Sequence, residues 1–320
     1  MLSRAAENIY WMARYLERAE NTARLLSVQT DTRLDHPDPA EAAWETVLGI
    51  TGTSGDFRGH GLECSEQAVA EFLLNDPRNP SSLLGICGRA RENSRTLLEI
   101  LPRESWEEIN RLHQRAAEPD IAVSQRRSEH LREIITRIQA LTGLFLGGMN
   151  DDEGHAFLRL GRAIERADFA TRVMLGNFHV IEQNTDDSQV IRGADWVGVL
   201  KSLTAFQMFR RAVQGPVTGP RVVRFLICSP VFPRSVAYCM HEIRQSLARL
   251  PRSGPIAAAV DRLSSELASE FCVSDQERDA SPLLAKLQSE LAGLHGMISA
   301  DYFTLGAGAP PPGQRQGQGT

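Results

Sequence analysis

Two stretches of the chain carry the same arrangement of glutamates and arginines, and these residues are the best suited to chemistry. Residues 14–24 read RYLERAENTAR and residues 162–172 read RAIERADFATR, with five identical positions and one Glu/Asp exchange. Arginine holds a carboxylate or a phosphate through forked hydrogen bonds, and a nearby carboxylate can act as a base. The candidate catalytic residues are therefore Glu17 and Glu165, and the candidate binding or ion-network residues are Arg14, Arg18, Glu20, Arg24, Arg162, Arg166, Asp168 and Arg172.

Three interpretations of this repeated charged motif are open. A solvated helix face would carry only i,i+3 and i,i+4 ion pairs, each contributing about 0.3 kcal/mol. The second copy replaces Tyr15 with Ala163 and Asn21 with Phe169 but keeps the charges. This retention favours an ion network between helices, in which breaking one pair leaves a charge unpaired. The third interpretation is a pocket for a carboxylate, a phosphate or a peptide terminus, with a glutamate as base.

Other catalytic and metal-binding signatures are absent from the sequence. None of the eight histidines follows a glutamate by three residues, as a ferritin-like di-metal bundle requires. The sequence contains no Gly-x-Ser-x-Gly, no phosphate-binding P-loop and no His-Glu-x-x-His. The five cysteines are scattered and never form Cys-x-x-Cys, so neither a disulfide framework nor a structural zinc site is expected. The sequence predicts no cofactor and no metal site.

Charge and hydropathy indicate which binding partners and which location are expected. The chain has 35 basic and 40 acidic residues and a net charge of −5, which gives no electrostatic support for nucleic-acid binding. No stretch approaches the roughly 18 consecutive apolar residues of a membrane-spanning helix. The opening residues lack the basic and apolar regions of a signal peptide. We therefore expect a cytoplasmic protein that binds neither nucleic acid nor membrane.

The elements that position the charged motif are predicted to be helices. Apolar residues recur at three- and four-residue intervals, and sustained period-two alternation is absent, so the sequence predicts an all-α fold. Proline and glycine clusters separate the segments. In the first half we expect helices at about 3–33, from 40 into the glycine-rich stretch 52–61, at 65–74, from 82 to the proline at 102, at 104–118 and at 121–146.

The two halves of the chain are similar in sequence beyond the charged motif. Residues 44–48 match 196–200, residues 72–83 match 225–236, and residues 141–144 match 291–294, all at offsets of 150 to 153. Such colinear matches indicate a tandem duplication of a unit of about 150 residues with five or six helices. We expect a helical bundle of two repeats related by a pseudo-two-fold axis, at residues 1–148 and 149–305, and a disordered tail rich in Gly, Pro and Gln at 306–320.

These motifs together resemble the bacterial alpha-E superfamily over residues 2–305. The resemblance rests on the opening LSRAAENIYW at residues 2–11, on the two Glu-Arg-Ala motifs and on FPRSV at residues 232–236. The first copy, at residues 79–82, lacks the arginine that the second copy has at 234. The resemblance implies an all-helical protein, typically encoded beside or fused to a circularly permuted ATP-grasp protein, often with a transglutaminase-like peptidase.

By this association the resemblance implies a system that makes, modifies or trims peptides through ATP-dependent amide-bond formation. We expect an accessory helical protein that binds the ATP-grasp ligase, its peptide substrate or both, rather than an independent enzyme. The transglutaminase-like peptidase is a further possible partner. Two alternatives are a self-contained enzyme that acts on peptide amides or carboxylates through the Glu/Arg motif, and a non-catalytic oligomeric scaffold. The sequence does not predict the oligomeric state.

Overall fold

The computed structural model describes residues 1–35, 40–118, 124–183, 189–271 and 280–304, and the regular structure in these ranges is helical. This confirms the predicted all-α fold. In chain order the helices are α1 (Ser3–Asp35), α2 (Ala40–Thr51), α3 (Ser54–Gly59), α4 (Glu66–Leu74), α5 (Leu83–Arg95), α6 (Arg103–Ala116), α7 (Ser124–Gly148), α8 (Glu153–Gln183), α9 (Gln189–Ser202), α10 (Phe206–Ala212), α11 (Gly219–Cys228), α12 (Val236–Leu247), α13 (Gly254–Phe271) and α14 (Ser281–Ile298), followed by the π-helical turn η1 (Ser299–Phe303).

Three of the described helices begin at serine N-caps. The hydroxyl oxygens of Ser65, Ser82 and Ser235 each accept a hydrogen bond from a backbone N–H in the first turn of α4, α5 and α12. Helix α3 was not predicted, because it lies in the glycine-rich stretch 52–61. It forms around the buried ring of Phe57, which packs edge-to-face on Phe72 at 5.2 Å between ring centroids.

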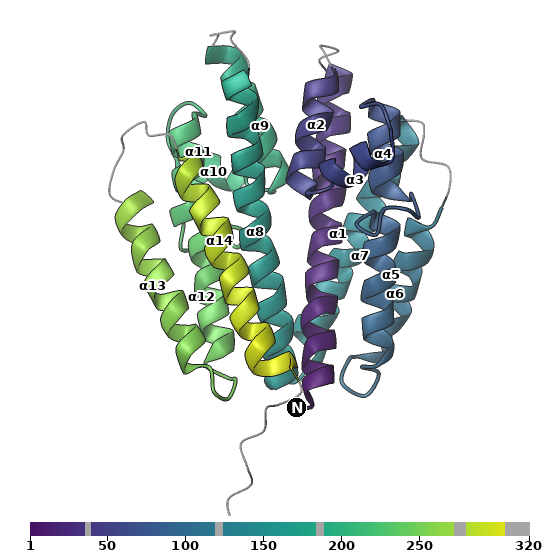
Figure 1. The fold of residues 1–320 in the computed structure, drawn as a ribbon, viewed down its shortest axis with the longest axis vertical. Helices are drawn as coiled ribbons and strands as arrows, with labels where there is room; N and C mark the ends of the chain where they lie inside the picture. Colours follow the sequence, from purple (N-terminus) through teal and green to yellow (C-terminus); the bar gives the residue numbers. More distant parts are fainter. Residues whose placement is uncertain (36–39, 119–123, 184–188, 272–279, 305–320) are drawn as a thin grey trace, which may run out of the picture.

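Two long helices, α1 and α8, run side by side through the middle of the molecule (Figure 1). They are parallel, because the amino group of Met1 lies 2.6 Å from the Glu153 carboxylate at one end and contacts continue at similar spacing along both helices. The helices approach closely at Gly161, where an added Cβ would lie 2.4 Å from the carbonyl oxygen of Tyr10. Glycine is required there because no side chain fits between the two backbones.

The remaining helices surround this central pair on two sides (Figure 1). Helices α2 to α7 lie on the α1 side and α9 to α14 on the α8 side. Helices α5 and α7 pack against α1, and α12 and α14 pack against α8, whereas α2 contacts α8 and α9 contacts α1. The buried apolar side chains of both sides form one continuous core. As a result, most of the surface of α1 and α8 is covered by other helices.

Three further sequence expectations compare with the structure as follows. Cys228 is disulfide-bonded, whereas Cys64, Cys87 and Cys239 are not in disulfides. The disulfide at Cys228 was not predicted, because the spacing of cysteines in a sequence does not show which of them meet in space. No helix in the described part of the chain is long and apolar enough to cross a membrane. The predicted tail at 306–320 lies outside the described residues.

Candidate functional site

The parallel packing of α1 and α8 places the two copies of the charged motif at the same level along the bundle. We call the interface between these helices the seam. Two groups of side chains meet there. The Glu17 cluster comprises Glu17, Glu20, Asn21, Arg24, Arg162, Arg166 and Arg234, and the Glu165 cluster comprises Arg14, Arg18, Glu165, Asp168 and Arg172.

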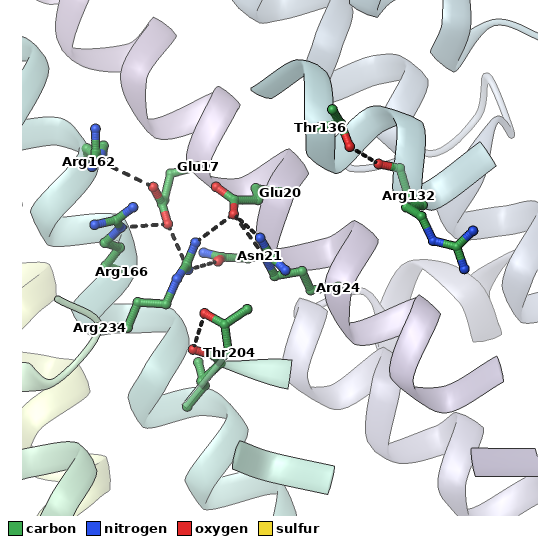
Figure 2. A network of polar contacts seen from close by, with 11 residues as sticks. Glu17, Glu20, Asn21, Arg24, Arg132, Thr136, Arg162, Arg166, Thr204 and Arg234 are labelled. Carbon is green, nitrogen blue, oxygen red and sulfur yellow. Dashed lines mark hydrogen bonds and ion pairs between the residues drawn. The ribbon is translucent and has the colours of Figure 1, made fainter. Parts of the chain in front are cut away.

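In the first cluster the Glu17 carboxylate is surrounded by three arginines (Figure 2). Arg166 Nε donates to Glu17 Oε1 at 2.8 Å, and Arg234 Nη1 lies 2.9 Å from the same oxygen. Arg162 Nε lies 3.7 Å from Glu17 Oε2, which is beyond hydrogen-bond distance. The Glu17 side chain is 2% exposed. Two arginines of α8 and one from the loop before α12 therefore hold a carboxylate of α1.

Arg234 extends this cluster along α1. Its Nη2 atom lies 2.9 Å from Glu20 Oε1, and its Nη1 atom donates to Asn21 Oδ1 at 2.7 Å. Arg24, one turn along the helix, donates to Glu20 Oε1 at 2.7 and 2.9 Å (Figure 2). One arginine thus ties the loop before α12 to two carboxylates and an amide of α1. Neither Arg234 nor Asn21 was among the predicted site residues.

In the second cluster two arginines of α1 hold a carboxylate of α8. Arg14 Nε donates to Glu165 Oε2 at 2.7 Å, and Arg18 donates through Nε at 2.5 Å and through Nη2 at 3.1 Å. The Glu165 side chain is 4% exposed. Asp168 accepts from Arg172 Nε at 2.8 Å, and the Arg172 side chain is 40% exposed. This cluster therefore has one side that reaches solvent.

The structure brings together all ten residues that the sequence singled out. Each glutamate pairs across the seam with arginines of the opposite helix. At the offset of 148, Arg18 matches Arg166 and Glu17 matches Glu165. The pair Arg18–Glu165 therefore corresponds to the pair Arg166–Glu17. The pairs Glu20–Arg24 and Asp168–Arg172 correspond in the same way, each within its own helix. The interpretation as a solvated helix face is wrong for both glutamates, because their side chains are buried.

The arginines keep the two buried glutamates ionised. Burial by itself would raise the pKa of Glu17, but the charges of Arg166, Arg234 and Arg162 outweigh it and lower the pKa to about 2. Arg14 and Arg18 likewise outweigh burial and lower the pKa of Glu165. Burial and the neighbouring charge of Arg166 lower the pKa of Arg162 to about 10. Arg162 is therefore less well compensated than the other arginines at the seam.

This geometry leaves little room for chemistry at the two glutamates. A general base works best when its pKa lies near the working pH, and it must reach the proton that it removes. Both glutamates instead direct their oxygens at arginines. The pocket that Glu17 and Arg162 line with mostly apolar side chains of α1, α7 and α8 has room for about one water molecule. Within the described ranges, no group of three or more His, Cys, Asp or Glu side chains could hold a metal ion.

Comparisons with known proteins agree with the helical fold and the charged motif. The model of the Alpha-E family, described as a predicted alpha-helical domain with a conserved ER motif, matches residues 1–303. This confirms the resemblance drawn from the sequence, and Glu-Arg-Ala stands at 17–19 and 165–167. Uncharacterized proteins of Mycobacterium bovis and Mycobacterium tuberculosis are each 24% identical over 341 residues. The alignment covers 98% of this chain but 38% of each relative, and no solved structure matches.

Proposed function

Because the chain belongs to the Alpha-E family, we propose that it is an accessory helical protein of an ATP-grasp-dependent system for peptide or amide-bond ligation or modification. It binds the ligase, its peptide substrate or both, and a transglutaminase-like peptidase is a further partner. The ATP-grasp and peptidase partners rest on the family resemblance. About three fifths of each relative lies outside the matched region, so the matched region there is one part of a larger chain.

A non-catalytic role is supported above all by the commitment of the two candidate bases to arginines. Glu17 and Glu165 are buried, ionised and paired at 2.5 to 2.9 Å. To accept a proton from a substrate, either glutamate would first have to leave its arginines, and two or three buried charges would then be unpaired. The network therefore holds α1 and α8 together and gives the partner a rigid helical surface.

The same contacts support a fold of two tandem repeats at residues 1–148 and 149–305. The ion pairs across the seam exchange between the halves, and the N-caps Ser82 and Ser235 stand at matched positions. Described helices α1 to α7 correspond in order to α8 to α14, which is more than the five or six helices expected per unit. On this proposal the seam lies along the pseudo-two-fold axis, so each copy of the motif meets the other.

Binding and ligase assays with purified proteins test the proposed function. The chain is mixed with a circularly permuted ATP-grasp protein, the partner that the family resemblance implies, and the affinity is measured by isothermal titration calorimetry. We expect a dissociation constant in the micromolar range or tighter, and a change in ATP-dependent ligation when the chain is added. Absence of binding at about 50 μM together with unchanged ligation would overturn the proposal. Turnover of peptides by this chain alone would also overturn it.

A further inference from the structure

A patch of aromatic rings and arginines lies beside the Glu165 cluster. We call it the arginine–aromatic patch, and it comprises Trp11, Tyr15 and Arg18 of α1 and Arg89 of α5. The rings of Trp11 and Tyr15 are stacked with 5.5 Å between centroids, and both side chains are half-buried. The Arg89 guanidinium lies 5.8 Å from the centre of the Tyr15 ring. Arg18 is one turn from Tyr15 on the same helix, so Trp11, Arg18 and Arg89 all adjoin Tyr15.

This patch carries positive charge that the described residues do not neutralise. Arg18 shares its carboxylate partner, Glu165, with Arg14, so two arginines face one negative charge. Asp168, the other carboxylate of the cluster, is paired with Arg172. The Arg18 side chain is 34% exposed. Arg89 is exposed and has no carboxylate partner among the described residues. The excess is local, because the whole chain has a net charge of −5.

The matched positions in the second half are built differently. By the offsets of the sequence matches, Arg159 stands in place of Trp11, Ala163 in place of Tyr15 and Glu242 in place of Arg89. Arg159 Nη2 donates to Glu242 Oε2 at 2.8 Å, so this surface is closed by an ion pair. An ion pair therefore suffices to close the surface between the central helix and its neighbour. The stacked rings and the positive charge of the first half have no counterpart there.

We propose that the arginine–aromatic patch binds a carboxylate of an acidic peptide segment. The Arg89 guanidinium receives the carboxylate, and Arg18 can add only its Nη1 group, because its Nε and Nη2 atoms donate to Glu165. An apolar neighbour in the peptide packs on the rings of Trp11 and Tyr15. Two arginines on a negatively charged chain do not provide the row of phosphate contacts that nucleic acids need. The inference deepens the proposed function by assigning the peptide site. Peptide binding by the chain alone tests it separately from ligase binding.

The experiment uses a short synthetic peptide of alternating Glu and Phe, acetylated and amidated at its ends. Affinity is measured by calorimetry at low salt, and the Trp11 indole N–H signal is followed by NMR after assignment with Trp11→Phe. We expect saturable binding with a shift of that signal. We also expect Arg89→Gln to weaken binding about tenfold, because a charge-assisted pair is lost. The matched control is Arg103→Gln on α6, whose side chain is 90% exposed, and it should leave the affinity unchanged.

A second peptide separates the two sources of carboxylate. It has Gln in place of Glu and a free C-terminal carboxylate, so binding of this peptide alone would assign the patch to a peptide terminus. Binding of either peptide with loss in Arg89→Gln supports the proposal. Failure of both peptides to bind, or equal binding by Arg89→Gln and Arg103→Gln, would overturn it. Because Arg89 is exposed, its replacement should leave the fold intact, and the unfolding midpoint checks this.

Discussion

The Glu17 and Glu165 clusters are built from the same motif, but they differ in how completely the carboxylate is enclosed. Glu17 faces three arginines, and Arg234 also bridges to Glu20 and Asn21. Glu165 faces two arginines, of which Arg18 is 34% exposed. The additional enclosure comes from a residue outside the motif, since Ser81 stands in the first half where Arg234 stands in the second. One loop residue thus adds a third arginine to Glu17, whereas Glu165 is buried beside two arginines of which one reaches solvent.

The two clusters also differ in the partners of their matched arginines. Arg14 donates to Glu165 at 2.7 Å and lies 5.0 Å from the centre of the Trp11 ring, so a carboxylate and an aromatic face both stabilise it. Arg162, at the matched position, lies 3.7 Å from Glu17 and lines the small pocket. The Glu17 cluster therefore contains the least satisfied arginine. The difference shows that matched residues of a repeated motif can contribute differently to the free energy of unfolding.

The largest expected effect is the loss of stability when either buried glutamate is replaced, and this loss should be larger at Glu17 than at Glu165. Glu17→Gln should reduce the free energy of unfolding by about 4 kcal/mol and Glu165→Gln by about 3 kcal/mol, because three arginines lose their carboxylate in the first case and two in the second. Urea unfolding of both variants measures this.

The matched control for these variants is Glu107→Gln on α6. Its carboxylate is 49% exposed and lies 3.6 to 3.7 Å from its arginines, so the loss should be below about 0.5 kcal/mol. Losses at Glu17 and Glu165 as small as this control, or a larger loss at Glu165 than at Glu17, would contradict the comparison.

The contribution of Glu17 to stability should depend on pH. The folded-state pKa of Glu17 is about 2, below its ordinary value of 4.5, so its contribution to stability is complete above about pH 5 and is lost as the pH falls towards 2. The stability advantage of the native chain over Glu17→Gln should shrink by about 2 to 3 kcal/mol over this range. Unfolding free energies at pH 7, 5, 4 and 3 measure this advantage. A constant difference between the two proteins at all four values would contradict the low pKa.

A smaller loss of stability is expected on replacing the matched arginines Arg14 and Arg162, and the two losses should differ. Arg14→Gln removes a buried hydrogen-bonded charge and its contact with Trp11, and it should cost about 2 kcal/mol. Arg162→Gln should cost less than about 1 kcal/mol, because Arg162 makes no hydrogen bond to Glu17 and its pKa is already lowered to about 10 by burial and by Arg166. Equal losses would mean that distance to the carboxylate does not set the energy of these pairs.

The sequence predicted the helical fold and the residues of the network because both depend on regular spacing. Apolar periodicity indicated the helices, and two copies of one motif on long helices indicated charges with a shared role. The retention of charge between the copies favoured an ion network between helices over a solvated face, but it left a binding or catalytic pocket at Glu17 and Glu165 open.

The sequence did not predict the parts of the site that depend on loops and on inter-helix register. Arg234 precedes α12, and its contact with Glu17 spans more than 200 residues, so no local pattern indicated it. Two signals pointed to Arg234: it replaces a small residue within an otherwise matched segment, and it lies in the FPRSV stretch at residues 232–236. Asn21 gave no signal, because Phe169 stands at its matched position. The direction in which α1 and α8 pack decides these contacts, and hydrophobic spacing does not fix that direction.

The central claim is that the Glu/Arg motif couples α1 to α8 across the seam, and a double-mutant cycle tests it most directly. The cycle measures unfolding free energies of Glu17→Gln, Arg166→Gln and the double variant, and a second cycle does the same for Glu165 and Arg18. We predict that in each cycle the double variant loses about 2 kcal/mol less than the sum of the single losses. Losses that add within about 0.4 kcal/mol in both cycles would contradict a network across the seam.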